Sequence, residues 1–195
     1  MSEGWSDESL TQVSGDEIVR VDFTYLRPVP VLFVRAVGPY KESSVAAWEA
    51  MIAWLEKNEL KSSVKRAVGF GQDNPRSIEP DALRYDACVE LSVPMREDPD
   101  NGIRMNPLPG GVYAVFRHQG AYSLIGKSFS RMCHEWAPTS GLEVDYRRPF
   151  LEMYLNDPAI TPDDDRLCDL CVPVAPVANA PRQDPSLMRA PAVLR

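Results

Sequence analysis

The sequence lacks the long apolar runs of a membrane protein. No stretch approaches the roughly 20 apolar residues that cross a bilayer, and the opening MSEGWSDESL has neither the basic nor the apolar region of a secretion signal. Cysteine is also scarce: four in a chain of 195 residues do not indicate a disulfide framework. We therefore expect a cytoplasmic protein without membrane contact.

Basic clusters are missing as well. The formal net charge is −7 and the pI about 4.9. The densest run of Lys and Arg, residues 61–66 (KSSVKR), follows a predicted helix and is typical of a solvated turn. An acidic surface repels nucleic-acid phosphates. The sequence therefore disfavours direct nucleic-acid binding and favours a cationic or neutral partner.

Cofactor and metal motifs are absent too. The sequence has no P-loop, HExxH or GxSxG, and Gly69-Phe70-Gly71 lacks the later glycine and helix of a dinucleotide site. The pair Cys168 and Cys171 lies in an apolar run closed by Pro173, so the two thiols should point to opposite faces of a strand. No second CxxC completes a zinc site. We expect neither metal nor cofactor, and a structural role for both thiols.

What the chain does contain is an internal repeat. Two apolar strands, residues 31–40 and 112–122, end in Gly-Pro-Tyr and Gly-Ala-Tyr, and a segment with helical apolar spacing follows each. Two strands follow in each half, at 67–75 and 84–94 and at 150–158 and 166–174. Asp86, Cys88 and Val89 match Asp169, Cys171 and Val172 at one offset of about eighty residues.

The repeat predicts the fold and the domain limits. Each copy follows the order β-α-β-β and is too small to bury its helix alone. We expect an α+β domain over residues 18–174, with repeat one at about 18–95 and repeat two at about 104–174. Its antiparallel sheet should have pseudo-twofold symmetry, helices on one face and a ligand groove on the other. Residues 1–17 form a predicted flexible leader, and residues 175–195 a flexible Ala/Pro-rich tail.

Strand 150–155 carries the main candidate site. Alternation places Leu151, Met153 and Leu155 on one side, which we assign to the helices, and Phe150, Glu152 and Tyr154 on the open side. A carboxylate between two rings suits an organic cation, through charge and cation–π attraction of roughly 0.5–2 kcal/mol per ring. The same carboxyl could act as a general acid or base, or could be a solvated surface group.

Further candidates surround this strand. Gly69 aligns with Glu152 and Gly71 with Tyr154, so the glycines mark either close approach of a ligand or a β-bulge. Tyr113 extends the aromatic wall or lies at its rim, and Trp136 contacts ligand or belongs to the core. Packing accounts better for Tyr40 and Tyr122, which follow the two turn glycines.

The chain resembles the GyrI-like family, also described as the AraC effector-binding or SbmC-like family. The resemblance rests on the two glycine turns, on residues 84–89 (RYDACV), on the helix end at Trp136 and on residues 149–154 (PFLEMY) running to Asn156-Asp157-Pro158. It covers nearly all of residues 19–174. It implies tandem β-α-β-β units that bind drug-like, often cationic molecules against a glutamate matching Glu152.

The resemblance leaves three functions open. The first is a stand-alone binder that senses or sequesters an amphipathic, cationic or aromatic small molecule. The second is a hydrolase of cyclopropane-containing alkylators, in which Glu152 activates water and Tyr154 donates to the leaving group. The third is a protein that contacts gyrase or a transcription regulator. About eighteen polar residues precede the first predicted strand, too few for a helix-turn-helix domain. The sequence does not indicate an oligomeric state.

Overall fold

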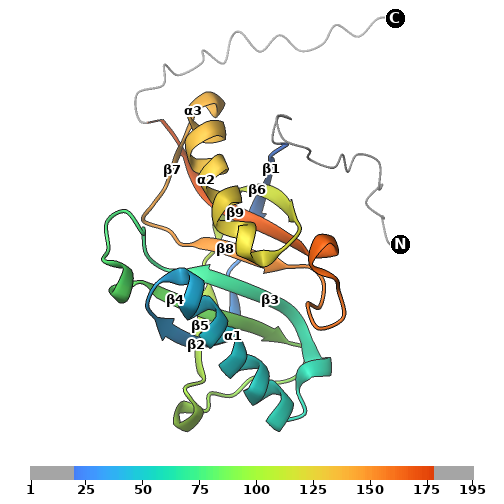
Figure 1. The fold of residues 1–195 in the computed structure, drawn as a ribbon. Coiled ribbons are helices and arrows are strands. Elements are labelled where there is room, and N and C mark those ends of the chain that lie inside the picture. Colours follow the sequence, from blue (N-terminus) through green and yellow to red (C-terminus); the bar gives the residue numbers. More distant parts are fainter. Residues whose placement is uncertain (1–19, 178–195) are drawn as a thin grey trace, which may run out of the picture.

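The computed structural model describes residues 20–177 (Figure 1). The strands are β1 (Asp22–Leu26), β2 (Val29–Val37), β3 (Val64–Gly71), β4 (Arg84–Leu91), β5 (Arg104–Leu108), β6 (Gly111–Gln119), β7 (Leu142–Val144), β8 (Phe150–Tyr154) and β9 (Leu167–Pro176). The helices are α1 (Tyr40–Lys57), α2 (Ile125–Arg131) and α3 (Ala137–Ser140), with a π-helical segment at Met132–Trp136 between the last two. Short 3-10 turns occupy Lys61–Ser63, Pro80–Ala82, Pro99–Asn101, Tyr122–Leu124 and Asp163–Asp165.

The predicted termini fall largely outside this range. The predicted leader at residues 1–17, and residues 178–195 of the predicted tail, lie outside the described residues. Strand β9 continues to Pro176, two residues past the expected end of the domain at residue 174. Within residues 20–177, no helix is both long enough and apolar enough to span a bilayer.

One antiparallel sheet joins the two repeats. Its strand order is β1-β6-β9-β8-β3-β4-β2-β5, and β7 pairs with β9 beside this path. Strands β3 and β8 meet at the centre, where Gly69 faces Glu152. The two outer pairings are exchanged between repeats, because β1 pairs with β6 of repeat two and β5 pairs with β2 of repeat one. Neither repeat completes its own sheet.

Matching residues confirm the pseudo-twofold relation. Arg35 pairs with Asp86 across β2 and β4, and Arg117 pairs with Asp169 across β6 and β9. Each repeat also has a glycine just before its helical segment. Gly38 and Gly120 take positive φ angles of 135° and 121°, a conformation that glycine adopts without steric cost. The expected α+β duplication is therefore present.

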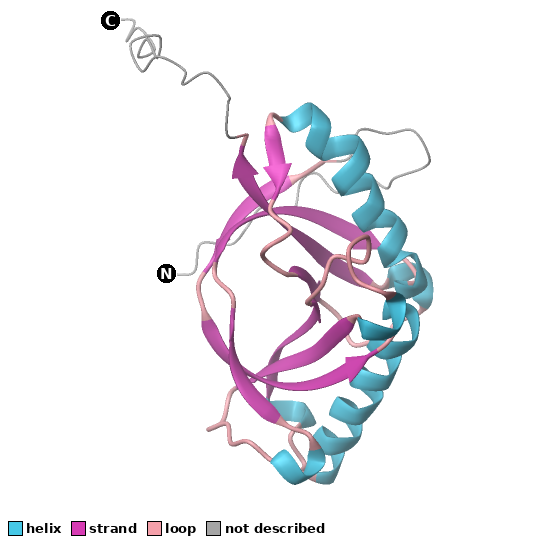
Figure 2. Cartoon of the chain, turned by 90° about the vertical axis from the view of Figure 1, so that its left-hand side faces the viewer, coloured by secondary structure: helices cyan, strands magenta, loops and turns pink. Residues whose placement is uncertain are grey.

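The sheet curls around an inner core. Val68, Phe70, Tyr113 and Leu151 lie in this inner cluster, with Cys171 and other buried side chains of the same face. Two further clusters pack on the outer face, one beneath α1 and one beneath α2 and α3. Figure 2 shows the strands bending around the inner core and the helices gathered along one outer side.

Three strands were not predicted, and the second helical segment is less regular than expected. Strands β1, β5 and β7 all pair with strands distant in sequence. Helix α1 runs for 18 residues, whereas α2 has 7 residues and gives way to the π-helical turn. The two helical sides of the molecule therefore differ in shape although the sheet is nearly symmetric.

Candidate functional site

A groove of about 1370 Å³ lies over the central strands, between the helical segments of the two repeats. Its floor comes from β3 and β8 and its walls from α1 and α2; representative lining residues are Trp48, Ala67, Gly71, Phe129 and Glu152. The groove therefore lies on the helix side of the sheet. The prediction that the groove lies on the face opposite the helices is therefore wrong.

The physical reason is the curl of the sheet. The predicted alternation along β8 holds: Leu151 and Met153 share one face, and Phe150 and Tyr154 share the other. The aliphatic face, however, closes on the inner core and does not face the helices. The two helical segments stand apart on the outer face, so the uncovered strip of sheet lies between them.

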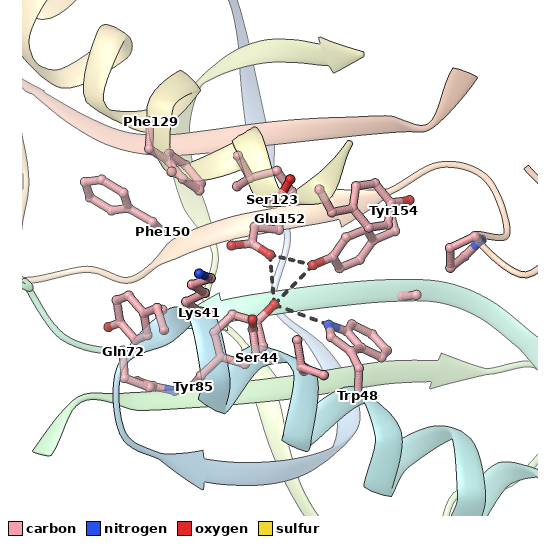
Figure 3. Close-up of a pocket in the computed structure, with 18 of the residues that line it drawn as sticks. Lys41, Ser44, Trp48, Gln72, Tyr85, Ser123, Phe129, Phe150, Glu152 and Tyr154 are labelled. Atoms are coloured by element: carbon pink, nitrogen blue, oxygen red, sulfur yellow. Dashed lines mark hydrogen bonds between the residues drawn. The ribbon is translucent and has the colours of Figure 1, made fainter. Parts of the chain in front are cut away.

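Glu152 occupies the middle of this strip (Figure 3). Its Oε2 atom accepts a hydrogen bond from the Tyr85 hydroxyl at 2.8 Å and another from the Tyr154 hydroxyl at 2.5 Å. The indole N–H of Trp48 donates to the Tyr85 oxygen at 3.2 Å. Residues from α1, β4 and β8 thus hold one carboxylate oxygen in a fixed position.

The other oxygen, Oε1, has no protein partner in the described part of the chain. Both hydrogen bonds to the carboxylate end on Oε2, and no Lys or Arg of residues 20–177 lies within ion-pair distance of Glu152. Burial raises the pKa of Glu152, and the hydrogen bonds from Tyr154 and Tyr85 oppose that rise. The half-buried carboxyl is therefore fixed on one side and open to a donor or cation on the other.

The two tyrosines stay protonated and act as donors. Burial, together with the Glu152 charge, raises the pKa of Tyr85 and of Tyr154 well above the ordinary value. Deprotonation of either would put a second negative charge beside the carboxylate. The arrangement thus supplies two fixed O–H groups over the whole physiological pH range.

Aromatic rings surround the carboxylate on both sides. Tyr154 contacts Trp48 edge-to-face, with ring centroids 5.2 Å apart, and Tyr122 at 4.9 Å. Phe150 contacts Phe129 at 5.4 Å. Ring faces next to a carboxylate attract organic cations and flat apolar groups. The groove is chemically suited to molecules that combine both features.

The predicted site residues fall into three groups: those that line the groove, one beneath it, and two away from it. Phe150, Glu152, Tyr154 and Gly71 line the groove. Gly69 lies under it: a Cβ at this position would be 2.0 Å from the Tyr85 hydroxyl oxygen and 2.7 Å from Glu152 Oε2. The close approach that requires a glycine there is made by the tyrosine, and it brings the phenol within reach of the carboxylate.

Tyr113 and Trp136 do not line the groove. Tyr113 is fully buried in the inner core, on the opposite face of the sheet, beneath the Arg148 guanidinium. Its strand β6 pairs with β9 and is not adjacent to β8. Trp136 packs against the cluster beneath α2 and α3 and contacts Phe23 of β1, with ring centroids 6.1 Å apart.

Sequence reasoning missed Trp48 and Tyr85, and it assigned Tyr40 and Tyr122 to packing. All four line the groove. Tyr85 could have been found by pairing strands, because β4 lies next to β3 and places Tyr85 opposite Gly71. Tyr40 has both roles: it lines the groove, and its hydroxyl donates to the Asp73 carbonyl oxygen at 2.7 Å and accepts from the Asp73 N–H at 2.9 Å.

The cysteine pair lies on opposite faces as predicted. Cys168 belongs to the cluster beneath α2 and α3, and Cys171 to the inner core. Both are free and buried, and burial raises the pKa of each thiol. In the described range, His, Cys, Asp and Glu side chains form no group that could hold a metal ion.

Fold and site together define a duplicated ligand-binding domain in which the carboxylate of Glu152 lies on the seam between the repeats. The chain belongs to the GyrI-like small molecule binding domain family, which it matches over residues 20–175. It is 34% identical over 140 residues to the probable transcriptional regulator YgiV of Escherichia coli (strain K12), covering 70% of this chain and 82% of that protein. It is 35% identical over 86 residues to a DNA gyrase inhibitor of Pectobacterium carotovorum subsp. carotovorum (strain PC1), covering 44% of this chain and 54% of that protein, about half of its length.

Two solved structures share the fold at low sequence identity. The C-terminal domain of EcmrR superposes with a TM-score of 0.65 at 12% identity, covering 83% of this chain and all of that one. SAV2435, solved bound to tetraphenylphosphonium, superposes with a TM-score of 0.59 at 13% identity, covering 80% of this chain and 94% of that one. Both likenesses establish the architecture.

Proposed function

We propose that this protein binds small amphipathic cations in the groove, with Glu152 as their charge partner. The observation that carries the proposal is the open Oε1 atom of a carboxylate that has no ion pair among residues 20–177. Leaving such a group uncompensated in a half-buried site costs stability, and a bound cation offsets that cost. The surrounding rings supply apolar contact and cation–π attraction.

The experiment is a calorimetric titration with tetraphenylphosphonium, a probe that carries one delocalised charge and four rings. We expect Glu152→Gln to weaken binding at least about fivefold, because a charge pair at ~4 Å contributes between ~1 and ~4 kcal/mol, depending on the local dielectric. The matched control is Glu143→Gln, which removes the same charge from exposed strand β7 outside the groove. Equal affinities of wild type and Glu152→Gln would refute the proposal.

The contact between Tyr154 and Glu152 favours a second candidate, the hydrolase. Glu152 Oε1 would take a proton from water while the water oxygen bonds to a strained ring carbon and a ring C–C bond at that carbon breaks. Tyr154 would donate a proton to the leaving group, which receives the electron pair of that bond. The Tyr154 hydroxyl now donates to Glu152 itself, so it must rotate towards substrate to serve as the acid. Turnover of a cyclopropane-containing alkylator that disappears in Glu152→Gln would establish the enzyme; binding without turnover favours the binder.

A protein partner is the third reading, and the names of the relatives motivate it. Co-purification with gyrase or with a DNA-binding regulator can be measured for the wild type and for Glu152→Gln. A complex that Glu152→Gln leaves intact would assign the contact to a surface outside the groove. A complex that the small cation displaces would couple the partner to the ligand site.

A further inference from the structure

The groove is lined by six basic side chains, and they are not equivalent. Four take part in ion pairs: Lys61 with Glu56, Lys65 and Arg66 with Glu90, and Arg148 with Asp145. The other two, Lys41 and Arg76, form no ion pair in the part of the chain that the structure describes. Both are exposed at the groove surface, so their charges remain available to a ligand.

These two cations gather at one end of the groove. Lys41 lies in the first turn of α1, next to Tyr40, whose ring lies beside Gly71. Arg76 also lines the groove, from the loop that follows β3, and the last residue of that strand, Gly71, pairs with Phe150. Tyr146 stacks on Phe150, with ring centroids 5.8 Å apart.

The open oxygen of Glu152 faces this same end. Figure 3 shows the carboxylate oxygen without hydrogen bonds directed towards Lys41 and Phe150, while Tyr154 and Trp48 lie on the other side. A ligand that reaches Oε1 is therefore flanked by aromatic rings and approached by two positive charges. A simple monocation gains from Glu152 but is repelled by Lys41 and Arg76.

We infer that the groove selects aromatic zwitterions, whose cationic centre contacts Glu152 and whose acidic group contacts Lys41 and Arg76. This inference rests on the function proposed above and names its ligand class. A zwitterion meets all three charges with the correct sign. A carboxylate on the ligand can accept two hydrogen bonds from the Arg76 guanidinium and a further one from Lys41.

The test compares one dye in two forms: rhodamine B, which carries a free carboxylate, and rhodamine B methyl ester, which does not. The two share size, rings and cationic charge. Binding of each is measured by fluorescence polarisation to wild type, Lys41→Gln/Arg76→Gln and Glu152→Gln. The matched control, Lys61→Gln/Lys65→Gln, removes two positive charges from the opposite end of the groove, where both side chains are exposed and paired.

We expect wild type to bind the acid about two- to fivefold more tightly than the ester, the range of exposed ion pairs. Lys41→Gln/Arg76→Gln should abolish this preference, the control pair should keep it, and Glu152→Gln should weaken both dyes by a similar factor. An ester bound as tightly as the acid by wild type, or a preference that survives in Lys41→Gln/Arg76→Gln, overturns the inference. If neither dye binds, or if Glu152→Gln binds both as wild type does, the proposed function itself fails.

Discussion

The Tyr85 hydroxyl reaches the Glu152 carboxylate, at 2.8 Å, by passing over Gly69, the residue that faces Glu152 across the central strand pair. The two strands at the seam are thus chemically unlike although they occupy symmetric positions. Repeat two supplies Glu152. Repeat one has Gly69 at the matching position, where the lack of a side chain leaves room for the Tyr85 phenol. One carboxylate results where symmetry would allow two.

Gly69→Ala should disrupt the site while preserving the fold. The new Cβ would lie 2.0 Å from the Tyr85 hydroxyl oxygen, so the phenol must leave Glu152. We expect a loss of about 1–3 kcal/mol in the free energy of unfolding, typical of overpacking, together with weaker cation binding. Thermal denaturation and calorimetry measure the two effects. Gly126→Ala in α2, whose Cβ would meet no atom within 4 Å, is the stability control; an equal loss there would contradict the explanation.

Removing either phenol hydroxyl should change the pH dependence of binding. The hydrogen bonds from Tyr154 and Tyr85 hold the pKa of Glu152 below the level that burial alone would give. Tyr154→Phe or Tyr85→Phe should therefore raise this pKa further, and cation affinity should begin to fall at a higher pH than in wild type. Dissociation constants of tetraphenylphosphonium between about pH 4 and 8 test this. An unchanged profile in both variants would show that these bonds do not tune the carboxyl.

Glu152→Gln should raise thermal stability at neutral pH. The folded-state pKa of Glu152 lies above the unfolded value, so its contribution to stability is full at low pH and is lost as pH rises through the folded pKa. Glutamine mimics the protonated form at every pH. The melting temperature of the variant should exceed that of wild type at pH 7, and the difference should vanish below about pH 4. A variant that is less stable at pH 7 would argue against a costly buried charge.

The two symmetric ion pairs should differ in their effect on stability. The side chain of Asp86 is 3% exposed and that of Asp169 is 22% exposed. Arg35→Met leaves a buried carboxylate without its cation and should cost about 3 kcal/mol. Arg117→Met should cost about 1 kcal/mol or less, because water reaches Asp169. Urea denaturation of both variants provides the measurement; equal losses would contradict the dependence on burial.

The sequence predicted the duplication and the alternation of side chains along β8, because both depend only on the spacing of residues along the chain. Glycine turns, apolar alternation and the constant offset can be recognised in the sequence without knowledge of the tertiary structure. The same reasoning placed Glu152, Phe150 and Tyr154 on one face, and the structure agrees. The local pattern could not show which face of β8 lies on the helix side of the sheet, because both faces of this strand pack against other side chains.

The misassigned residues share one cause, which is pairing between distant segments. Tyr113 was a candidate for the wall or the rim of the groove because its strand was expected to pair near β8, whereas β9 lies between β6 and β8. Trp48 and Tyr85 were missed because each fits an apolar pattern, and their polar atoms find partners only after α1 and β4 pack together. Strands β1 and β5 escaped notice for the same reason, since each pairs with the other repeat.

The exchanged outer strands also bear on how the chain assembles. A fragment holding only repeat one would have β1 without β6 and β2 without β5. Each unpaired strand edge could then pair with a fragment that holds the missing strand. Two halves produced separately should therefore recombine into one particle and should not fold as independent lobes. Covalent continuity in the native chain guarantees a one-to-one ratio of unlike halves, and so guarantees that every assembled groove carries one Glu152.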